Sequence, residues 1–356
     1  MQILIVAGGQ GTRLWPASTK SKPKQLLSFL NNKTLLENTY ERFSNSFSDS
    51  VFIATTKHYA KDIQKTLPSI PKSHYSIEPT LKDRAPAIGL AALILHHHDP
   101  EAVFMTAWSD HYIKEEKKFI NIIKNAERYL HKNPETTITI GIIPSEPHIG
   151  YGYIGTHSPI QNNLNLPLYK VKEFKEKPDL QTAQKYLRRG NYLWNSGSFL
   201  WKTKTLLTLF EKHLPEIYSL LQKILPYIGT KKQQNMINKI YPDMPKIEIE
   251  HGLIEKLDNL ATIRADITWA DVGNWQIIKK IQSPKGNALN GNVETINTNN
   301  SLIYNYGHGL VATIGISDLA VVVTDDTTLI TTLKEAELIK SLITNLKSHP
   351  KNNKFV

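Results

Sequence analysis

Short apolar runs alternate with amphipathic segments over the first 150 residues of the chain. The apolar runs have the length of buried strands and lie at residues 2–6, 51–54, 102–106 and 136–143. Between them, Thr34 and Glu37 form a capping box, and Asp83 is a candidate cap for a second helix. Residues 116–131 repeat apolar positions at helical spacing. Strands that alternate with helices predict an α/β fold with βαβ units and a mostly parallel sheet.

The pattern changes after residue 150 and again near residue 284. Three further helices are predicted at residues 179–190, 203–213 and 215–225. From residue 284 short apolar strands are separated by Asn and Gly, and an amphipathic helix is predicted over residues 333–346. We therefore expect two domains, residues 1–283 and residues 284–356. The second is β-rich, and a few rungs of a β-helix are an interpretation that its irregular period leaves open.

The composition narrows the class of protein. The 356 residues carry 43 Lys and Arg against 32 Asp and Glu, a net charge of +11, and no cysteine. The lack of cysteine excludes a disulfide framework, a Cys-ligated zinc site and a thiol nucleophile. The positive charge is compatible with nucleic acid, an anionic membrane surface or a polyanionic small molecule as the partner.

Two observations reduce these choices. The lysines are scattered rather than clustered beside aromatic residues, which argues against a nucleic-acid partner. The first residues lack a basic segment before their short apolar run, and no run of about 18 apolar residues occurs. We therefore expect no nucleic acid, no membrane segment and a cytoplasmic location.

The loop after the first predicted strand contains three closely spaced glycines, Gly8, Gly9 and Gly11. Such glycines let the backbone approach a ligand and direct its N–H groups at a phosphate. Arg13 and, further along, Lys24 add positive charge. No Gly-Lys-Ser/Thr closes the loop as in a P-loop, and Leu14 stands where a Rossmann fingerprint has its third glycine. A tight turn with surface cations is the alternative, and the neighbouring Arg13 and Lys24 make it less favoured.

One stretch, Gly8-Gly-Gln-Gly-Thr-Arg-Leu-Trp-Pro16 followed by Pro23-Lys-Gln25, resembles the signature of the sugar-phosphate nucleotidyltransferases. Its Leu-Trp-Pro and Pro-Lys-Gln details resemble the mannose-1-phosphate guanylyltransferase branch, also called GDP-mannose pyrophosphorylase. The match continues in seven ordered blocks: Glu78-Pro79 with Ala85-Pro-Ala87, Ser109-Asp-His111, Gly150-Tyr-Gly-Tyr-Ile154, Phe174-Lys-Glu-Lys-Pro-Asp179, Leu193-Trp-Asn-Ser-Gly197, Glu255-Lys256 and Trp269-Ala-Asp-Val-Gly-Asn-Trp275.

The resemblance implies a Rossmann-like mixed sheet and gives roles to individual residues. Those that it implies for nucleotide binding are Ala7, Gly8, Gly9, Gly11, Thr12, Glu78, Pro79, Ala85 and Pro86. Arg13 and Lys24 are the implied catalytic cations. The resemblance also implies a short, monofunctional form without the cupin-like isomerase domain of longer relatives, and it leaves a homodimer open.

Asp110 and Asp271 are the candidate metal ligands. Asp110 follows a predicted buried strand, at the carboxyl end where open α/β sheets bind ligands. Mg²⁺ prefers carboxylate and phosphate oxygens. An aspartate in such a place is more often a cap or turn residue, and spacing alone does not bring these two together. The resemblance implies that they share one Mg²⁺.

The resemblance further implies a sugar-phosphate site formed by Gly152, Glu176, Lys177 and Asn195. Glu176 would accept hydrogen bonds from sugar hydroxyls, and Lys177 would face the sugar phosphate. An ordinary surface charge pair is the alternative interpretation of the Glu176-Lys177 dipeptide, and the surrounding motif disfavours it.

The chain departs from the family pattern at Asp83-Arg84, Trp108 and Glu250-His251. Asp83 either caps a helix or accepts hydrogen bonds from the base, and Arg84 either donates to the base or faces solvent. Base recognition is therefore less determined by the sequence than phosphate binding.

The implied reaction transfers GMP from GTP to mannose-1-phosphate, with Mg²⁺ as cofactor. The attacking phosphate is already ionised, so positioning and charge neutralisation do the work. Two alternatives remain open: an enzyme for another nucleotide or sugar-1-phosphate, and a non-catalytic subunit that binds a sugar nucleotide. The presence of Arg13, Lys24 and the two aspartates argues against the latter.

Overall fold

The computed structural model of the protein describes residues 1–164 and 166–356. The chain forms two compact units. Unit 1 consists of Met1–Gly8, Thr39–Ser109 and Ile113–Trp269, and unit 2 consists of Gly9–Asn38, Asp110–Tyr112 and Ala270–Val356. The boundary expected between residues 283 and 284 divides the sequence in another way, and it stays a prediction.

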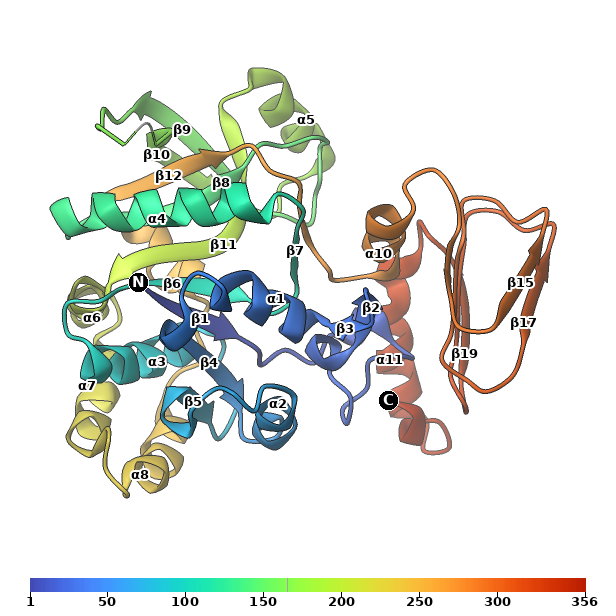
Figure 1. Cartoon of the computed structure of the whole chain (residues 1–356), viewed down its shortest axis with the longest axis horizontal. Helices are drawn as coiled ribbons and strands as arrows, with labels where there is room; N and C mark the ends of the chain where they lie inside the picture. Colours follow the sequence, from blue (N-terminus) through green and yellow to red (C-terminus); the bar gives the residue numbers. More distant parts are fainter. Residues whose placement is uncertain (165) are drawn as a thin grey trace. The chain divides into compact units, whose positions relative to one another are not determined.

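Unit 1 is built on a nine-stranded sheet with the strand order β5-β4-β1-β6-β11-β8-β12-β10-β9 (Figure 1). Its first four strands run parallel: β5 (Tyr75–Glu78), β4 (Val51–Thr56), β1 (Gln2–Val6) and β6 (Val103–Trp108). The others are β11 (Tyr192–Lys202), β8 (Thr137–Ile142), β12 (Leu260–Ala265), β10 (Leu168–Lys175) and β9 (Tyr153–Pro159). Because β11 runs antiparallel to both β6 and β8, and β10 antiparallel to both β12 and β9, the sheet is mixed. The predicted α/β class with a mixed sheet is confirmed, but the expectation of a mostly parallel sheet is wrong, since parallel pairing is confined to the first four strands and to β8 with β12.

Two helices of unit 1 have the predicted caps. The helices of this unit are α2 (Ala60–Thr66), α3 (Arg84–His98), α4 (Glu116–Lys132), α5 (Leu180–Arg189), α6 (Thr203–His213), α7 (Pro215–Ile224), α8 (Gln233–Ile240) and α9 (Ile249–Gly252). Asp83 caps α3 and Asp179 caps α5, where the Asp179 carboxylate accepts from the Thr182 N–H at 2.8 Å. Gly190 ends α5 at φ +69°, a left-handed conformation that costs glycine little. These predictions are confirmed.

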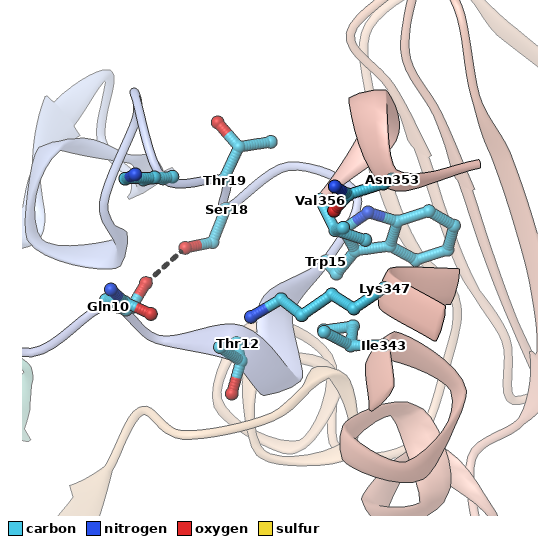
Figure 2. Close-up of a pocket in the computed structure, with 10 residues that line it drawn as sticks. Gln10, Thr12, Trp15, Ser18, Thr19, Ile343, Lys347, Asn353 and Val356 are labelled. Carbon is cyan, nitrogen blue, oxygen red and sulfur yellow. Dashed lines mark hydrogen bonds between the residues drawn. The ribbon is translucent and has the colours of Figure 1, made fainter. Parts of the chain in front are cut away.

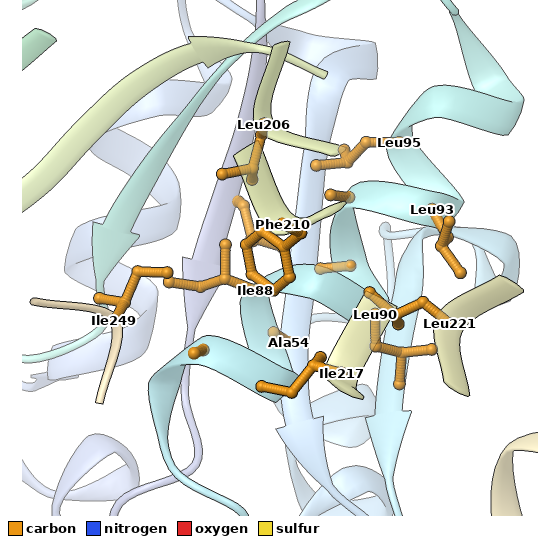
Figure 3. Packing of buried hydrophobic residues seen from close by; sticks show 14 of the residues in the cluster. Ala54, Ile88, Leu90, Leu93, Leu95, Leu206, Phe210, Ile217, Leu221 and Ile249 are labelled. Atoms are coloured by element: carbon orange, nitrogen blue, oxygen red, sulfur yellow. The ribbon is translucent and has the colours of Figure 1, made fainter. Parts of the chain in front are cut away.

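The core of unit 1 surrounds α3, whose residues from Ala85 to Leu95 are all buried. Side chains of α6 and α7 pack against it, among them Phe210 and Leu221 (Figure 3). A Cβ at Gly89 would lie 2.7 Å from the Phe210 ring, so glycine allows the helices to approach closely. A helix that is apolar all round belongs in such a core, and each large side chain buried there contributes about 1.5–3 kcal/mol.

Unit 2 stacks short strands in two rows. One sheet has the order β14 (Ala288–Asn290), β16 (Leu302–Asn305), β18 (Leu319–Val323) and β19 (Thr328–Thr332), of which the first three are parallel and β19 is antiparallel to β18. A second sheet pairs β15 (Val293–Ile296) with β17 (Val311–Ile314) in parallel. Ala288, Leu302 and Ala320 lie in register and are buried. Successive parallel rungs with aligned apolar residues are typical of a β-helix, so this interpretation is now favoured.

The remaining elements of unit 2 are β2 (Ser28–Leu30), β3 (Lys33–Thr34), α10 (Trp275–Gln282) and α11 (Ile339–Ser348), and α1 (Leu35–Ser44) begins there. The predicted start of the last helix at residue 333 is wrong. Leu333, Ala336 and Ile339 are all buried, but the first two lie in a turn and a short 3₁₀ helix that continue the apolar spacing before α11 begins. Within residues 1–164 and 166–356, every helix is too short or too polar to cross a membrane.

Candidate functional site

The glycine loop is fixed in unit 2 by its own turn and by a buried tryptophan. Gly11 adopts φ +68°, and a Cβ there would overlap the Lys24 side chain, so both conformation and space require glycine. Thr12–Leu14 form a 3₁₀ turn closed by the bond from Leu14 N–H to the Gly11 carbonyl at 3.0 Å. Trp15 is buried in the apolar cluster of unit 2, and its carbonyl accepts from the Trp275 indole at 3.1 Å. The backbone that carries Arg13 is therefore anchored to a core.

Lys24, Asp110 and Asp271 meet in unit 2. The Lys24 ammonium donates to Asp110 Oδ2, and its Nζ lies 4.0 Å from Asp271 Oδ1. The short strands β7 (His111–Ile113) and β13 (Trp269–Asp271) pair, and the Val272 N–H donates to the Asp110 carbonyl at 2.9 Å. This pairing brings together two aspartates that are remote in sequence, as the resemblance implied.

The charges in this cluster shift one another's pKa values. Burial lowers the pKa of Lys24, but Asp110 and Asp271 raise it more, so its net pKa is raised and it stays protonated. Burial raises the pKa of Asp110, but the charges of Lys24 and His111 lower it further, and the net pKa is lowered. Burial and the charge of Asp110 raise the pKa of Asp271. The Asp110–Lys24 ion pair therefore persists at neutral pH, while Asp271 carries a charge that its surroundings compensate poorly.

The donor atoms of this cluster fit a hard divalent cation. Two carboxyl groups share one ammonium, which leaves negative charge in excess. Asp271 Oδ1 is buried and accepts no hydrogen bond from residues 1–164 or 166–356. Over the same residues, no group of three or more carboxylate or imidazole ligands occurs. Two protein carboxylates completed by water and substrate phosphates are the usual environment of Mg²⁺ in nucleotide enzymes.

A cavity of about 420 Å³ lies beside the glycine loop in unit 2 (Figure 2). It is lined by Gln10, Thr12, Trp15, Ser18, Thr19, Lys20, Ile343, Lys347, Asn353 and Val356. The Ser18 hydroxyl donates to the Gln10 carbonyl at 2.7 Å and closes the loop on itself (Figure 2). The lining includes Thr12 from the predicted nucleotide-binding set, but Arg13, Lys24 and the two aspartates are outside it.

In unit 1, the predicted nucleotide-binding residues lie at the carboxyl ends of β1 and β5. The Ala7 N–H donates to the Ala54 carbonyl at 2.8 Å, and Gly8 lies against Glu78, since a Cβ there would be 3.5 Å from Glu78 Oε1. Burial raises the pKa of Glu78 to about 7, although the hydrogen bond from Tyr241 Oη at 2.5 Å lowers it. The other predicted members are Pro79, which follows β5, and Ala85 and Pro86, which are buried in the first turn of α3.

All four predicted sugar-phosphate residues are neighbours in unit 1. The Asn195 N–H donates to the Gly152 carbonyl at 2.7 Å, and a Cβ at Gly152 would overlap the Glu176 carboxylate. The Lys177 ammonium lies 3.0 Å from Glu176 Oε1, at the end of a side chain that is 58% exposed. A carboxylate and an amide side by side, with an ammonium at the rim, suit a phosphorylated sugar with several hydroxyl groups.

Arg84 is neither a solvent-facing residue nor unpaired. Its Nη1 lies 2.6 Å from Glu250 Oε1, its Nη2 lies 3.4 Å from Glu248 Oε2, and its guanidinium lies 5.7 Å from the centre of the Trp108 ring. The side chain of Glu250 is only 4% exposed, and its pKa is raised by burial although Arg84 lowers it. Arg84 is therefore ion-paired rather than simply facing solvent, its donation to a base stays a prediction, and Asp83 does cap its helix.

Comparison with known proteins decides the family. Residues 2–284 match the family described as Nucleotidyl transferase, and residues 291–346 match the MannoseP isomerase/GMP-like beta-helix domain. Mannose-1-phosphate guanylyltransferase 2 of Escherichia coli O157:H7 is 33% identical over 360 residues, which cover 97% of this chain and 73% of that protein. Mannose-1-phosphate guanylyltransferase of Escherichia coli (strain K12) is 30% identical over 352 residues, with the same two coverages.

The chain belongs to the mannose-1-phosphate guanylyltransferase family. A solved structure agrees with this assignment. The protein named mannose-1-phosphate geranyltransferase from Thermus thermophilus is similar with a TM-score of 0.86 and 27% identity, and the match covers 97% of this chain and 99% of that one. The match to the structure named mannose-6-phosphate isomerase from Helicobacter pylori has a TM-score of 0.58 at 23% identity and shows the fold alone. The chain is thus a sugar-phosphate nucleotidyltransferase of the mannose-1-phosphate guanylyltransferase family.

Within this family member, the sequence did not reveal two pairs of side chains. The Arg84–Glu250 ion pair joins two positions that depart from the family pattern. A new cation and a new anion among these departures were the sequence signal for a pair. The Arg13–Glu337 pair, in unit 2, had no signal, because Glu337 lies in a segment interpreted as a plain amphipathic helix.

Proposed function

We propose that the protein transfers GMP from GTP to mannose-1-phosphate and releases GDP-mannose and pyrophosphate. The observation that carries the proposal is the cluster of Lys24, Asp110 and Asp271 in a member of this family. A subunit that only binds a sugar nucleotide has no need for two carboxylates around one ammonium, since these groups repel a phosphate unless a cation lies between them.

The chemistry needs no protein nucleophile. A phosphate oxygen of mannose-1-phosphate attacks the α-phosphorus of GTP, the bond from that phosphorus to the bridging oxygen breaks, and pyrophosphate leaves. The attacking phosphate carries its own negative charge, so no general base has to remove a proton. Asp110 and Asp271 would hold Mg²⁺, which when bound neutralises charge on phosphate oxygens as a Lewis acid.

The protein's own groups position the reactants and neutralise charge. Lys24, whose raised pKa keeps it cationic, and Arg13 would bind the triphosphate and stabilise charge on the leaving pyrophosphate. The backbone of Gly9 and Gly11 would bring N–H groups to the same phosphates. Glu176, Asn195 and the Gly152 backbone would orient the sugar hydroxyls, with Lys177 at the sugar phosphate.

Guanine is the base that we propose. Guanine has donors at N1 and the 2-amino group and an acceptor at O6, and adenine lacks this combination. Asp83 caps a helix and Arg84 is ion-paired, which leaves the backbone around Glu78 and Pro79 to pair with the base edge. A pocket that pairs polar edges rejects the wrong base because its own groups would be left without partners.

The test is pyrophosphate release with mannose-1-phosphate and each of GTP, ATP, UTP and dTTP. We expect GTP to exceed ATP in kcat/KM by about 10²–10⁴-fold. If UTP or dTTP equals GTP, the protein is a nucleotidyltransferase for another nucleotide, and the change at Asp83-Arg84 is the first place to seek the cause. If no nucleotide and no sugar-1-phosphate supports release, the protein is a binding subunit.

A further inference from the structure

The side chain of Arg13 is held by Glu337, a residue from the far end of the chain in the same unit. Arg13 Nη1 lies 3.0 Å from Glu337 Oε2 and 3.4 Å from Oε1. Arg13 Nε and Nη2 make no hydrogen bond to any residue in the described part of the chain, residues 1–164 and 166–356. A guanidinium has five N–H donors, so one nitrogen fixes the group while three donors remain available to a ligand.

Glu337 is itself oriented by Asn274. The Asn274 amide Nδ2 donates to Glu337 Oε1, while its Oδ1 accepts from the Ile277 N–H at 2.9 Å and caps α10. Asn274 is only 4% exposed, and the next residue, Trp275, is fully buried in the core of unit 2. A continuous set of hydrogen bonds therefore connects a buried helix cap to the guanidinium through one carboxylate.

The position of the guanidinium relative to the metal-ligand candidates is also restricted. A Cβ at Gly273 would lie 2.9 Å from Arg13 Nη2 and 3.6 Å from Asp271 Oδ1. The unbound edge of Arg13 and the Asp271 carboxylate thus both lie close to Gly273, where a side chain would have no room. The unbound edge of Arg13 therefore lies near Asp271, one of the two residues that would hold the cation.

We propose that Glu337, oriented by Asn274, is a positioning residue that holds Arg13 for the triphosphate of the nucleotide. This inference rests on the proposed function, since it takes Arg13 as a ligand of the triphosphate. It gives the C-terminal segment a part in the chemistry, because Glu337 lies between β19 and α11. An arginine that is free to adopt several rotamers loses conformational entropy each time it binds a phosphate, which weakens its effect on the rate. An arginine that is already held in the binding rotamer avoids this loss.

The Arg13–Glu337 ion pair is too exposed to contribute much to the stability of the fold. The side chains of Arg13 and Glu337 are 40% and 55% exposed, and ion pairs in such places contribute little to folding. The opposite functional role is a latch: the Glu337 carboxylate would compete with phosphate for Arg13 and slow nucleotide binding. The two roles predict changes of opposite sign when Glu337 is replaced.

The test compares Glu337→Ala with Glu335→Ala, a change of another exposed glutamate two residues earlier that makes no ion pair with the described residues. We expect Glu337→Ala to raise both the KM and the calorimetric Kd for GTP by about 10-fold and to lower kcat by about 3- to 10-fold. The KM for mannose-1-phosphate should stay within about 2-fold, and Tm should move by no more than about 2 °C. Glu335→Ala should match the wild type in every measurement.

A paired exchange tests the role of Asn274. In Glu337→Gln alone, the single oxygen of the introduced glutamine can accept from Asn274 or from Arg13, so its amide nitrogen faces a donor on the other side. In Asn274→Asp alone, two carboxylates face each other. In the double variant the introduced glutamine can donate its amide to the introduced aspartate while its oxygen still faces Arg13, and that aspartate still caps α10. We expect the double variant to recover at least about 3-fold in kcat/KM for GTP over either single variant.

Several results would overturn the inference. The first is a Glu337→Ala enzyme whose Kd for GTP is unchanged. The second is tighter GTP binding by this variant, which indicates the latch. The third is a fall in kcat and in Tm with no change in the KM for GTP, which indicates a structural role. The proposed function fails in a different way, since a wild type that binds no nucleoside triphosphate and releases no pyrophosphate refutes both proposals. If the wild type prefers another nucleoside triphosphate, the same measurements with that nucleotide decide the role of Glu337.

Discussion

The two candidate regions of the molecule use ion pairs in different ways. In unit 2, Lys24 lies between two aspartates that stay partly accessible, and the carboxylates outnumber the ammonium. In unit 1, Arg84 lies against Glu250, whose carboxylate is buried and whose Oε2 has no hydrogen-bond partner in the described residues. Both clusters place two carboxylates around one cation, since Arg84 also pairs with Glu248, but the two aspartates are partly accessible to a ligand whereas the Glu250 carboxylate is buried.

This difference follows the family pattern. Lys24, Asp110 and Asp271 lie in blocks that match the family signature, whereas Arg84 and Glu250 are both departures from it. Phosphate chemistry is common to every substrate pair of such enzymes and needs exposed charge. A buried pair that replaces other residues contributes to the local structure around the residues predicted to bind the base and the sugar phosphate. Loss of a charge should therefore reduce catalysis in unit 2 and stability in unit 1.

The largest expected effect is on catalysis, from Asp110→Asn and Asp271→Asn in unit 2. Each change removes one of the two anionic ligands of the proposed Mg²⁺ site, and we expect kcat to fall by about 10³-fold, or about 4 kcal/mol in the barrier. Asp271→Asn should not lower Tm, because it relieves repulsion between two carboxylates. The measurement is kcat against Mg²⁺ concentration for each variant.

The matched control is Asp266→Asn, which changes an exposed aspartate paired only with Lys118 among the described residues. This control should keep wild-type turnover. A variant at Asp110 or Asp271 with near-normal kcat would contradict the shared metal and make the comparison between the two regions meaningless.

The next effect is on stability, from Arg84→Ala in unit 1. The change leaves the Glu250 carboxylate buried without its cation, which we expect to lower the free energy of unfolding by about 2–3 kcal/mol at pH 8. Denaturant titration measures it, with the exposed Arg128→Ala as the control, expected to cost less than about 0.5 kcal/mol. The double variant Arg84→Ala with Glu250→Gln should recover part of the loss. An Arg84→Ala loss no larger than that of Arg128→Ala would show that the pair is only a surface contact.

Local chemistry made much of the fold predictable. The capping box is present as predicted, with the Glu37 carboxylate accepting from the Thr34 N–H at 2.7 Å and the Thr34 hydroxyl accepting from the Glu37 N–H at 3.1 Å. Such bonds join residues three apart, so the sequence contains all of their geometry. The prediction of the start of α11 was wrong because it depended on tertiary contacts and not on local ones. Leu333 and Ala336 are buried by tertiary packing at a spacing that imitates a helix.

In the candidate site, too, local features could be predicted from the sequence and long-range pairs could not. The glycine loop could be interpreted from its own residues, but the meeting of Asp110 with Asp271 required the family resemblance, because it depends on the pairing of two strands that are remote in sequence. The bond from Arg13 to Glu337 joins positions 324 residues apart and belongs to no motif. The pairing of Arg84 with Glu250 joins positions 166 residues apart. Long-range pairs without a shared motif need coordinates.

A smaller effect is expected at the sugar-phosphate residues of unit 1, from Lys177→Ala. Because the Lys177 side chain is largely exposed, the change should leave Tm unaltered. We expect the KM for mannose-1-phosphate to rise by about 10- to 30-fold while the KM for GTP stays within about 2-fold. Lys175→Ala, at the exposed end of β10, is the control and should change neither value. Equal increases in both KM values would mean that Lys177 serves the nucleotide phosphates instead.

The smallest effect concerns Glu78, a buried carboxyl group of unit 1. It forms no ion pair with residues 1–164 or 166–356, whereas Glu250 pairs with Arg84. Its folded-state pKa of about 7 lies above its ordinary value of 4.5. Between these two values the folded protein keeps a proton that the unfolded chain releases. The contribution of Glu78 to stability therefore falls as pH rises from about 4.5 to about 7, and it stays at its lowest level above that range.

Glu78→Gln should remove this dependence, because glutamine has no proton to lose and can still accept a hydrogen bond from Tyr241. We expect the free energy of unfolding of the variant to exceed that of the wild type by about 1–2 kcal/mol at pH 8. The pKa difference of Glu78 alone corresponds to about 3 kcal/mol, and the gain is smaller because burial of the amide also costs free energy. The two proteins should be equal near pH 4.5. Glu216→Gln, a change of an exposed glutamate in α7, should alter stability at neither pH. A constant difference between wild type and Glu78→Gln from pH 4.5 to 8 would mean that Glu78 is already ionised in the folded protein, and that unit 1, like unit 2, has an uncompensated carboxylate available to a ligand.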